Sequence, residues 1–281
     1  MKFKIASELT YDVYSDTTFF FNIQAAPSLN QSIIHEKLSL TDGIVFEEFT
    51  LINNDTRFIK LQVEANKTFT IAYEAEVLAH YQIIQEADLL KPIPIMALHH
   101  EVLPYIAPSR HCESDKLIHF STRKFGHLPH NYAKVLAIND WIFESIDYRP
   151  GSTSANVSAC DTLIQRMGVC KDFAHLAIAL CRAIDIPARY FTGYAFDMSP
   201  PDLHACFEAY LGGHWIVFDP TRLASLNSLV KIAHGRDASE VAVASYYGNT
   251  YCAAMTISCD ITDHDFVPFR LAPGEIAGLS Y

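Results

Sequence analysis

The sequence predicts an α+β protein in which an antiparallel β-sandwich precedes a helix packed on a second antiparallel sheet. Residues 1 to about 90 hold several short runs that alternate apolar and polar side chains between turn-forming residues. Later in the chain, a strongly apolar helical stretch follows Gly168, and Gly212-Gly213 joins two β-type segments as a hairpin loop would. Half of the 281 residues are apolar and 19% are charged, which excludes a disordered or fibrous chain.

The elements fall into three expected segments. Residues 1–90 form the β-sandwich domain, and residues 91–130 form a proline-punctuated linker with short helices. Residues 131–281 form the domain that contains the candidate catalytic residues. Within it, apolar residues spaced by three and four predict a helix over 131–147, and a shorter helix over 161–167 ends at Gly168.

Charge and hydropathy limit the partners of this chain. Lys plus Arg is 21 and Asp plus Glu is 32, so the formal net charge is −11 and no basic run offsets it. Such a chain repels phosphate backbones, so we expect no nucleic-acid partner. No apolar stretch approaches the length of a membrane span, and the N-terminus lacks a signal-like apolar segment, so we expect a cytoplasmic protein without a membrane partner.

The seven cysteines predict free thiols rather than a disulfide framework. Their number is odd, their spacing is irregular and no CxxC pair occurs. His99-His100 and His111-Cys112 would need further donors at fixed spacing to bind a metal, and we favour loop residues or satisfied hydrogen bonds for them. We expect no metal and no organic cofactor. The composition does not decide the oligomeric state.

One cysteine stands where a nucleophile could be activated. Cys170 comes two residues after Gly168, at the start of the apolar helix that ends before Asp185. Unpaired N–H groups and the helix dipole at that end stabilise a thiolate. A buried, inert thiol is the alternative, as expected for Cys181 in the body of the same helix.

The hairpin around Gly212-Gly213 brings a histidine and an aspartate together. If Leu211 faces His214, then His204 and Asp219 become diagonal neighbours on one face, close enough for an imidazole to bridge. A three-residue loop would shift the register by one and turn Asp219 to the other face. The sequence thus supports the His–Asp half of a Cys–His–Asp arrangement and leaves the approach of Cys170 to His204 as an assumption.

Other polar residues near these motifs have structural interpretations that we favour over catalytic ones. His175 lies about 140° around the helix from Cys170, so packing or a supporting hydrogen bond is expected for it. Asp172 complements the helix dipole in the first turn. For Arg189 and Glu208 we expect a structural ion pair between strands rather than a role in substrate binding.

Candidates for an oxyanion donor are weak. Gln165 lies five residues before Cys170 but falls within a predicted helix, and Trp141 is weaker still. The main-chain N–H of Cys170 is the safer donor. We expect Trp215 to belong to the sheet core rather than to a substrate platform.

Taken together, these motifs resemble the transglutaminase-like superfamily, and most closely its bacterial cysteine-protease branch with an N-terminal β-region. The resemblance covers most of the chain and rests on the following residues: Gly168-Val169-Cys170, Pro187-Ala188-Arg189, Gly193-Tyr194, His204-Ala205, Trp215, Asp219-Pro220-Thr221 and Gly235-Arg236-Asp237-Ala238.

The resemblance implies a papain-like core in which Cys170, His204 and Asp219 form a catalytic triad. The implied reaction is acyl transfer on a peptide or protein amide through a thioester, with hydrolysis expected. Transfer to an amine, as in transglutaminases, and a non-catalytic binding protein that keeps the fold are the alternatives. One departure is visible: the family usually has tryptophan two residues after the histidine, and this chain has Cys206.

Overall fold

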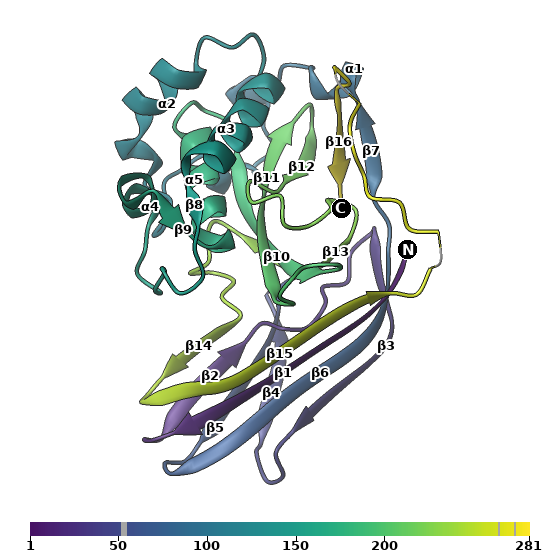
Figure 1. Cartoon of the computed structure of the whole chain (residues 1–281), viewed down its shortest axis with the longest axis vertical. Coiled ribbons are helices and arrows are strands. Elements are labelled where there is room, and N and C mark those ends of the chain that lie inside the picture. Colours follow the sequence, from purple (N-terminus) through teal and green to yellow (C-terminus); the bar gives the residue numbers. More distant parts are fainter. Residues whose placement is uncertain (52–54, 264, 273) are drawn as a thin grey trace.

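The computed structural model describes residues 1–281 apart from 52–54, 264 and 273. Long β-strands form the lower region in Figure 1, and helices α2–α5, within residues 118–182, gather on one side of a shorter sheet in the upper region. The predicted α+β class is confirmed, and the four-stranded sheets are antiparallel. No helix in the described part of the chain is long and apolar enough to cross a membrane.

Two four-stranded sheets form the β-sandwich that the N-terminal pattern predicts. Alternate side chains are buried along Lys2–Val13 and Lys67–Ala79, because successive residues of a strand point to opposite faces. The sheets meet through aromatic rings such as Tyr11 and Phe19, whose centroids lie 5.2 Å apart. The first sheet has the order β15 (Thr250–Ile261), β1 (Lys2–Val13), β6 (Lys67–Ala79), β3 (Gln31–Leu40), and the second has the order β14 (Ala244–Tyr247), β2 (Thr17–Phe21), β5 (Arg57–Val63), β4 (Phe46–Thr50).

The last long strands of the chain return to this sandwich. β15 pairs with β1 along its whole length, and β14 pairs with β2. Residues 244–261, which the sequence analysis grouped with the second domain, therefore belong to the sheets of the first. The three-segment division itself stays a prediction. The sandwich is held by pairing between residues about 250 positions apart as well as by its local hairpins.

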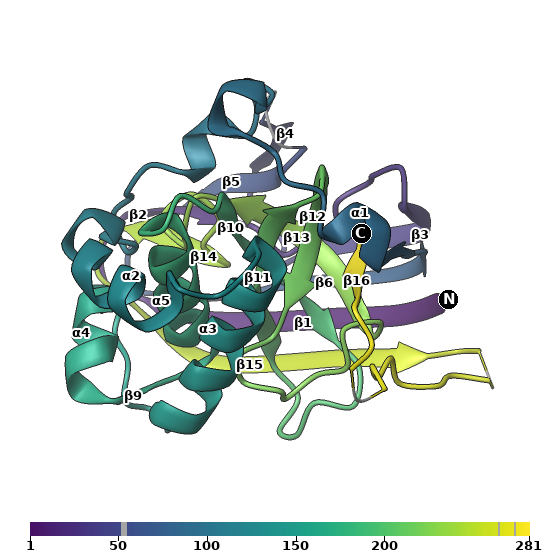
Figure 2. The same cartoon turned by 90° about the horizontal axis from the view of Figure 1, so that it is seen from above.

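A third four-stranded sheet supports the upper region. The helix α5 packs against its central strands β10 and β11, and every residue of α5 from Asp172 to Arg182 is buried. Figure 2 shows α2, α3 and α4 grouped around α5. The sheet order is β12 (His214–Phe218), β11 (Leu203–Leu211), β10 (Ala188–Ala195), β13 (Leu229–Gly235), and the helices are α2 (Ile118–Phe125), α3 (Asn131–Ser145), α4 (Ala159–Gln165) and α5 (Cys170–Arg182).

Short elements complete the fold. Three 3₁₀ turns occupy part of the predicted linker, and two pairs of short strands complete the fold. The antiparallel pair joins β7 to the C-terminal β16, and the parallel pair joins β8 to β9. These elements are α1 (Glu86–Leu89), η1 (Ile95–Ala97), η2 (Leu103–Tyr105), η3 (Ser114–Lys116), β7 (Gln82–Gln85), β8 (Asp147–Tyr148), β9 (Met167–Gly168) and β16 (Ala277–Ser280).

Candidate active site

The thiol of Cys170 stands at the N-terminus of the buried helix α5. The helix begins at Cys170, directly after β9 and the single residue Val169, and Cys170 is half-buried. Gly168 is required at this entry, since a Cβ there would lie 2.7 Å from the Cβ of Asp172. The sequence prediction that Cys170 opens a buried helix is therefore confirmed.

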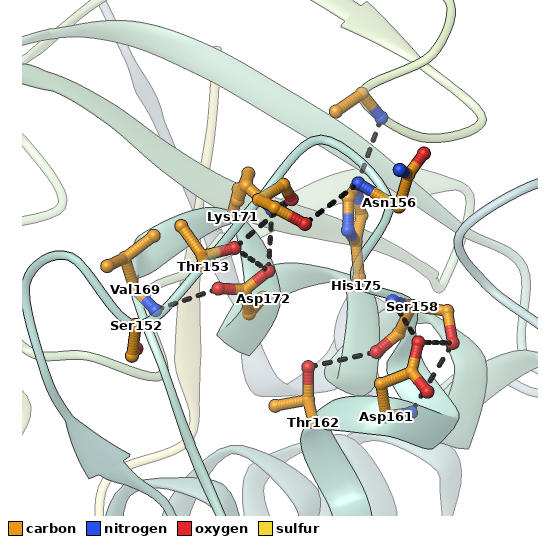
Figure 3. Close-up of polar contacts among 12 residues, drawn as sticks. Ser152, Thr153, Asn156, Ser158, Asp161, Thr162, Val169, Lys171, Asp172 and His175 are labelled. Carbon is orange, nitrogen blue, oxygen red and sulfur yellow. Dashed lines mark hydrogen bonds and ion pairs between the residues drawn. The ribbon is translucent and has the colours of Figure 1, made fainter. Parts of the chain in front are cut away.

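Asp172 holds the first turn of α5 in place, as Figure 3 shows. Its carboxylate accepts a hydrogen bond from the main-chain N–H of Val169 at 2.9 Å. It also accepts the hydroxyl of Thr153 at 3.0 Å and pairs with the ammonium of Lys171 at 2.7 Å. Because Lys171 also donates to the carbonyl oxygen of Ser154, the loop before α4 is tied to the residues that flank Cys170.

We expect Asp172→Ala to lower the alkylation rate of Cys170 and to cost about 1 kcal/mol of unfolding free energy, the usual effect of losing a helix-capping side chain. The matched control is Asp161→Ala, because Asp161 forms the equivalent capping box with Ser158 on the neighbouring helix α4. The control should lose similar stability without changing Cys170. Alkylation followed by mass spectrometry checks this, and equal alkylation rates in both variants would contradict a positioning role for Asp172.

The hairpin β11–β12 sets His204 beside Asp219. Leu211 faces His214 and Phe207 faces Phe218, which confirms the predicted register. Both loop glycines have positive φ, +58° at Gly212 and +95° at Gly213, as a tight two-residue hairpin loop requires. The next pair after Phe207 and Phe218 would be Cys206 and Asp219. Asp219 therefore lies on the same face of the sheet as Cys206 and as His204, which is two residues from Cys206.

His204 and Asp219 form a buried pair. The ring Nε2 of His204 lies 2.9 Å from Oδ2 of Asp219, and their side chains are 0% and 2% exposed. The other carboxylate oxygen, Oδ1, accepts the main-chain N–H of Thr221 at 2.9 Å and its hydroxyl at 2.7 Å. The Asp-Pro-Thr turn thus fixes the carboxylate, and the carboxylate fixes the ring.

His204 and Asp219 each stabilise the charged form of the other. Burial alone would lower the pKa of His204, but the Asp219 carboxylate outweighs it, and with Cys206 and Cys170 contributing, the pKa lies well above its ordinary value. Burial alone would raise the pKa of Asp219, yet His204 and Thr221 bring it below its ordinary value. An imidazolium formed beside this carboxylate is therefore stabilised.

The other six cysteines differ from Cys170 in how deeply the thiol is buried or in the element that carries it. Burial raises the pKa of Cys112, Cys206 and Cys259 to about 12 and that of Cys160 to about 11, so these thiols stay protonated at neutral pH. Cys181 is fully buried in α5, as predicted, and burial raises its pKa further. Cys252 is exposed on β15. Of the seven thiols, Cys170 alone combines a helix N-terminus with partial exposure beside His204.

The segment Gly235-Arg236-Asp237-Ala238 takes part in a second polar network, which includes His111 and His175 of α5. The carboxylate of Asp237 accepts the main-chain N–H of His111 at 2.8 Å. The N–H of Ala238 donates to Nε2 of His175 at 3.1 Å, and the rings of His175 and His111 stack. Burial lowers the pKa of His175 to about 3, so the ring is neutral. The predicted supporting hydrogen bond of His175 is confirmed.

The expected Arg189–Glu208 pair is present and is part of a larger buried cluster. Arg189 donates to Glu208, and Lys231 of β13 lies 3.4 Å from both Glu208 oxygens. Burial lowers the pKa of Lys231 to about 8 even though Glu208 opposes the shift. Trp215 is half-buried, and its ring lies 4.2 Å from the Arg189 guanidinium, so it covers this cluster rather than filling the sheet core.

The two side-chain candidates for an oxyanion donor lie in other surroundings. Gln165 is exposed at the end of α4. Trp141 packs against Phe120 of α2 and lies under the Arg166 guanidinium.

The sequence analysis missed one residue beside the thiol. Tyr148 pairs with Gly168 in the parallel β8–β9 bridge, and its ring packs 5.8 Å from that of Phe173 in the first turn of α5. Burial raises the pKa of Tyr148 to about 12, with Cys170 contributing. A parallel contact between two-residue strands about 20 positions apart leaves no pattern in the sequence, so no local signal could have found it.

The chain is similar to known proteins over most of its length. Residues 119–220 match the transglutaminase-like superfamily, and residues 1–101 match the bacterial transglutaminase N-terminal domain. A solved structure from Cytophaga hutchinsonii, described as a putative cysteine protease, is 50% identical with a TM-score of 0.97, covering 100% of this chain and 97% of that one. The chain belongs to the transglutaminase-like superfamily. For this superfamily member, the comparisons support cysteine-type catalysis in general.

Curated relatives of this superfamily member are more distant. An uncharacterized protein of Mycobacterium leprae is 35% identical over 117 residues, which is 38% of this chain and 42% of that protein. An uncharacterized protein of Mycobacterium tuberculosis is 30% identical over 146 residues, 46% of this chain and 45% of that protein. The chain therefore spans less than half the length of these relatives.

Proposed function

We propose that this protein is a cysteine hydrolase that cleaves peptide or isopeptide amides, with Cys170 as nucleophile, His204 as base and acid, and Asp219 as the residue that orients the ring. The supporting observation is the buried His204–Asp219 pair on the hairpin beside the N-terminus of α5. The similarity to a protein described as a putative cysteine protease favours water as the acceptor.

The reaction follows from the chemistry of these three groups. His204 takes the thiol proton of Cys170, and the sulfur attacks the amide carbon to form a tetrahedral oxyanion. The main-chain N–H of Cys170 is the proposed donor to that oxygen. The C–N bond then breaks, and the amine leaves with the proton from His204. A water molecule gives a proton to His204 and attacks the thioester, which releases the carboxylic acid and restores the thiol.

A glutamine-containing peptide incubated with a labelled primary amine tests the choice of acceptor. Hydrolysis predicts ammonia release or peptide cleavage without label in the product, and the Cys170→Ala variant should produce neither. Label incorporation would instead favour a transglutaminase-type transferase, the alternative that membership of the superfamily supports. No turnover and no thiol reactivity at Cys170 would leave only a binding role for the fold.

A further inference from the structure

One side of the β-sandwich ends in two edge strands that follow each other in the chain, β14 and β15 (Figure 1). Among the described residues, β15 pairs with β1 alone and β14 pairs with β2 alone. Each strand therefore has one edge without a neighbouring strand. Natural sheets usually protect such edges with charged residues or cover them.

Side chains that point into the sandwich are exposed on this side. Met255 of β15 pairs directly with Leu9, so both point to the same face, yet Leu9 is 1% exposed and Met255 is 47% exposed. Tyr246 of β14 pairs in the same way with the fully buried Phe19 and is 50% exposed. Cys252 pairs with a buried tyrosine and is also exposed. The apolar interior of the sandwich thus reaches solvent at the β14/β15 side.

The opposite side of the sandwich carries charged residues. Arg57 of β5 donates to both carboxylate oxygens of Glu36 on β3 at 2.8 and 2.9 Å, and lies 3.8 Å from Glu48 on β4. This ion cluster links the two edge strands of that side. Residues 241–259, which include β14 and most of β15, contain no Asp, Glu, Lys, Arg or His. The β14/β15 side therefore lacks the charges that prevent a sheet edge from associating.

Charge and composition favour a second copy of this chain as the partner. With a net charge of −11, two copies repel each other over most of their surfaces and least where a surface is uncharged. Tyrosine and methionine are enriched at the centres of protein interfaces, where charged residues are scarce. A two-fold axis would place the same residues of both copies opposite each other and cover both open sides, which limits the assembly to two chains.

The exposed area is sufficient for such a contact. Tyr246, Tyr247, Tyr251 and Met255 are between 47% and 71% exposed. Side chains of this size offer together roughly 450 Å² in each copy. Two copies would bury about 900 Å² through these side chains, and the strand backbones bring the total above the roughly 1,000 Å² of a small specific interface. Because the register of β15 shifts at Ala253, side-chain packing rather than a long shared ladder would carry the contact.

We propose that the protein forms a two-fold homodimer in which the β14/β15 sides of two sandwiches pack against each other. Met255 and Tyr246 lie at the centre of this contact, and Cys252 is covered by it. The dimer buries apolar side chains that the monomer leaves in water. The proposal does not depend on the proposed hydrolase function.

Sedimentation velocity of the full chain tests the dimer. At about 10–100 µM the wild-type chain should sediment with twice the monomer mass. Met255→Lys should raise the dissociation constant at least about tenfold, because two like charges would meet across the axis. The matched control is Ile34→Lys, since Ile34 is a comparably exposed apolar residue on the opposite edge strand β3, and it should leave the dissociation constant unchanged. Circular dichroism verifies that each variant is folded.

Alkylation of Cys252 by iodoacetamide gives a second readout. Its rate should fall as the wild-type concentration rises through the dissociation constant, and it should stay constant in Met255→Lys. In dilute protein the copies separate, and Cys252 reacts as an exposed thiol.

Three results would overturn the dimer. A wild-type chain that stays monomeric at about 100 µM would leave this side to a different partner. A dimer that survives Met255→Lys unchanged would place the interface elsewhere, and species that keep growing beyond two chains would exclude a closed two-fold contact. None of these results depends on the reactivity of Cys170, so the dimer and the proposed hydrolase can fail separately.

Discussion

Iodoacetamide at pH 6 is expected to alkylate Cys170 at least about tenfold faster than Cys252, and His204→Ala should remove that advantage. The reason is that a thiolate reacts and a thiol does not, and the raised pKa of His204 favours an imidazolium that can pair with a thiolate. Cys252 is the reference because it is exposed on β15. Digestion and mass spectrometry after timed quenching give both rates in one sample.

The control for this experiment is His214→Ala. His214 lies on the same hairpin and faces Leu211, whereas the hydrogen bond to Asp219 comes from His204. The control should leave the Cys170 rate unchanged, which separates loss of the base from general disturbance of the hairpin. Equal rates at Cys170 and Cys252 in the wild-type chain, or a Cys170 rate that survives His204→Ala, would contradict the proposed activation of Cys170 by His204.

Glu208→Gln is expected to lower the unfolding free energy by about 3–5 kcal/mol. Glu208 is fully buried and contacts both Arg189 and Lys231, so its neutralisation leaves two cationic groups close together without a counter-charge. Urea denaturation measures the loss. Glu47→Gln is the matched control, since Glu47 pairs with Lys60 at 3.2 Å but both side chains are about half exposed or more. The control should change stability by less than about 1 kcal/mol.

The effect of Glu208 also depends on pH in a definite direction. Burial alone would raise its pKa, but Arg189 and Lys231 outweigh burial and hold the pKa below the ordinary value of 4.5. The stabilisation is therefore complete above the unfolded pKa and is lost as pH falls through the folded pKa. The stability difference between wild type and Glu208→Gln should shrink below about pH 4.5. A difference that stays constant between pH 6 and pH 3.5 would contradict this assignment.

Features of the site that depend on local sequence were predictable. The buried helix begins at Cys170 because Gly168 precedes an apolar run, and the Gly212-Gly213 loop fixes the register that pairs His204 with Asp219. Period-two alternation likewise predicted strands over 58–63 and 69–77, which the structure has as β5 and β6.

Features that depend on distant pairing were not predictable. β14 and β15 join the N-terminal sheets, and Tyr148 reaches α5 through a two-residue parallel bridge. The contact of Asp237 with His111 links residues 126 positions apart. None of these contacts alters the local hydrophobic period, so each becomes visible only when the chain is folded. The nearness of Cys206 to His204 and Asp219 follows from the hairpin register.

Acetylation by p-nitrophenyl acetate tests the proposed chemistry most directly, because this activated ester needs no specific substrate pocket. A nucleophile activated by His204 and Asp219 predicts a burst of p-nitrophenol of about one equivalent and an acetyl group on Cys170 after acid quenching. Asp219→Asn should slow the burst by about two to four orders of magnitude. An acetyl group on Cys206 or another residue, or no burst from the folded wild-type chain, would contradict the assignment of Cys170 as the nucleophile.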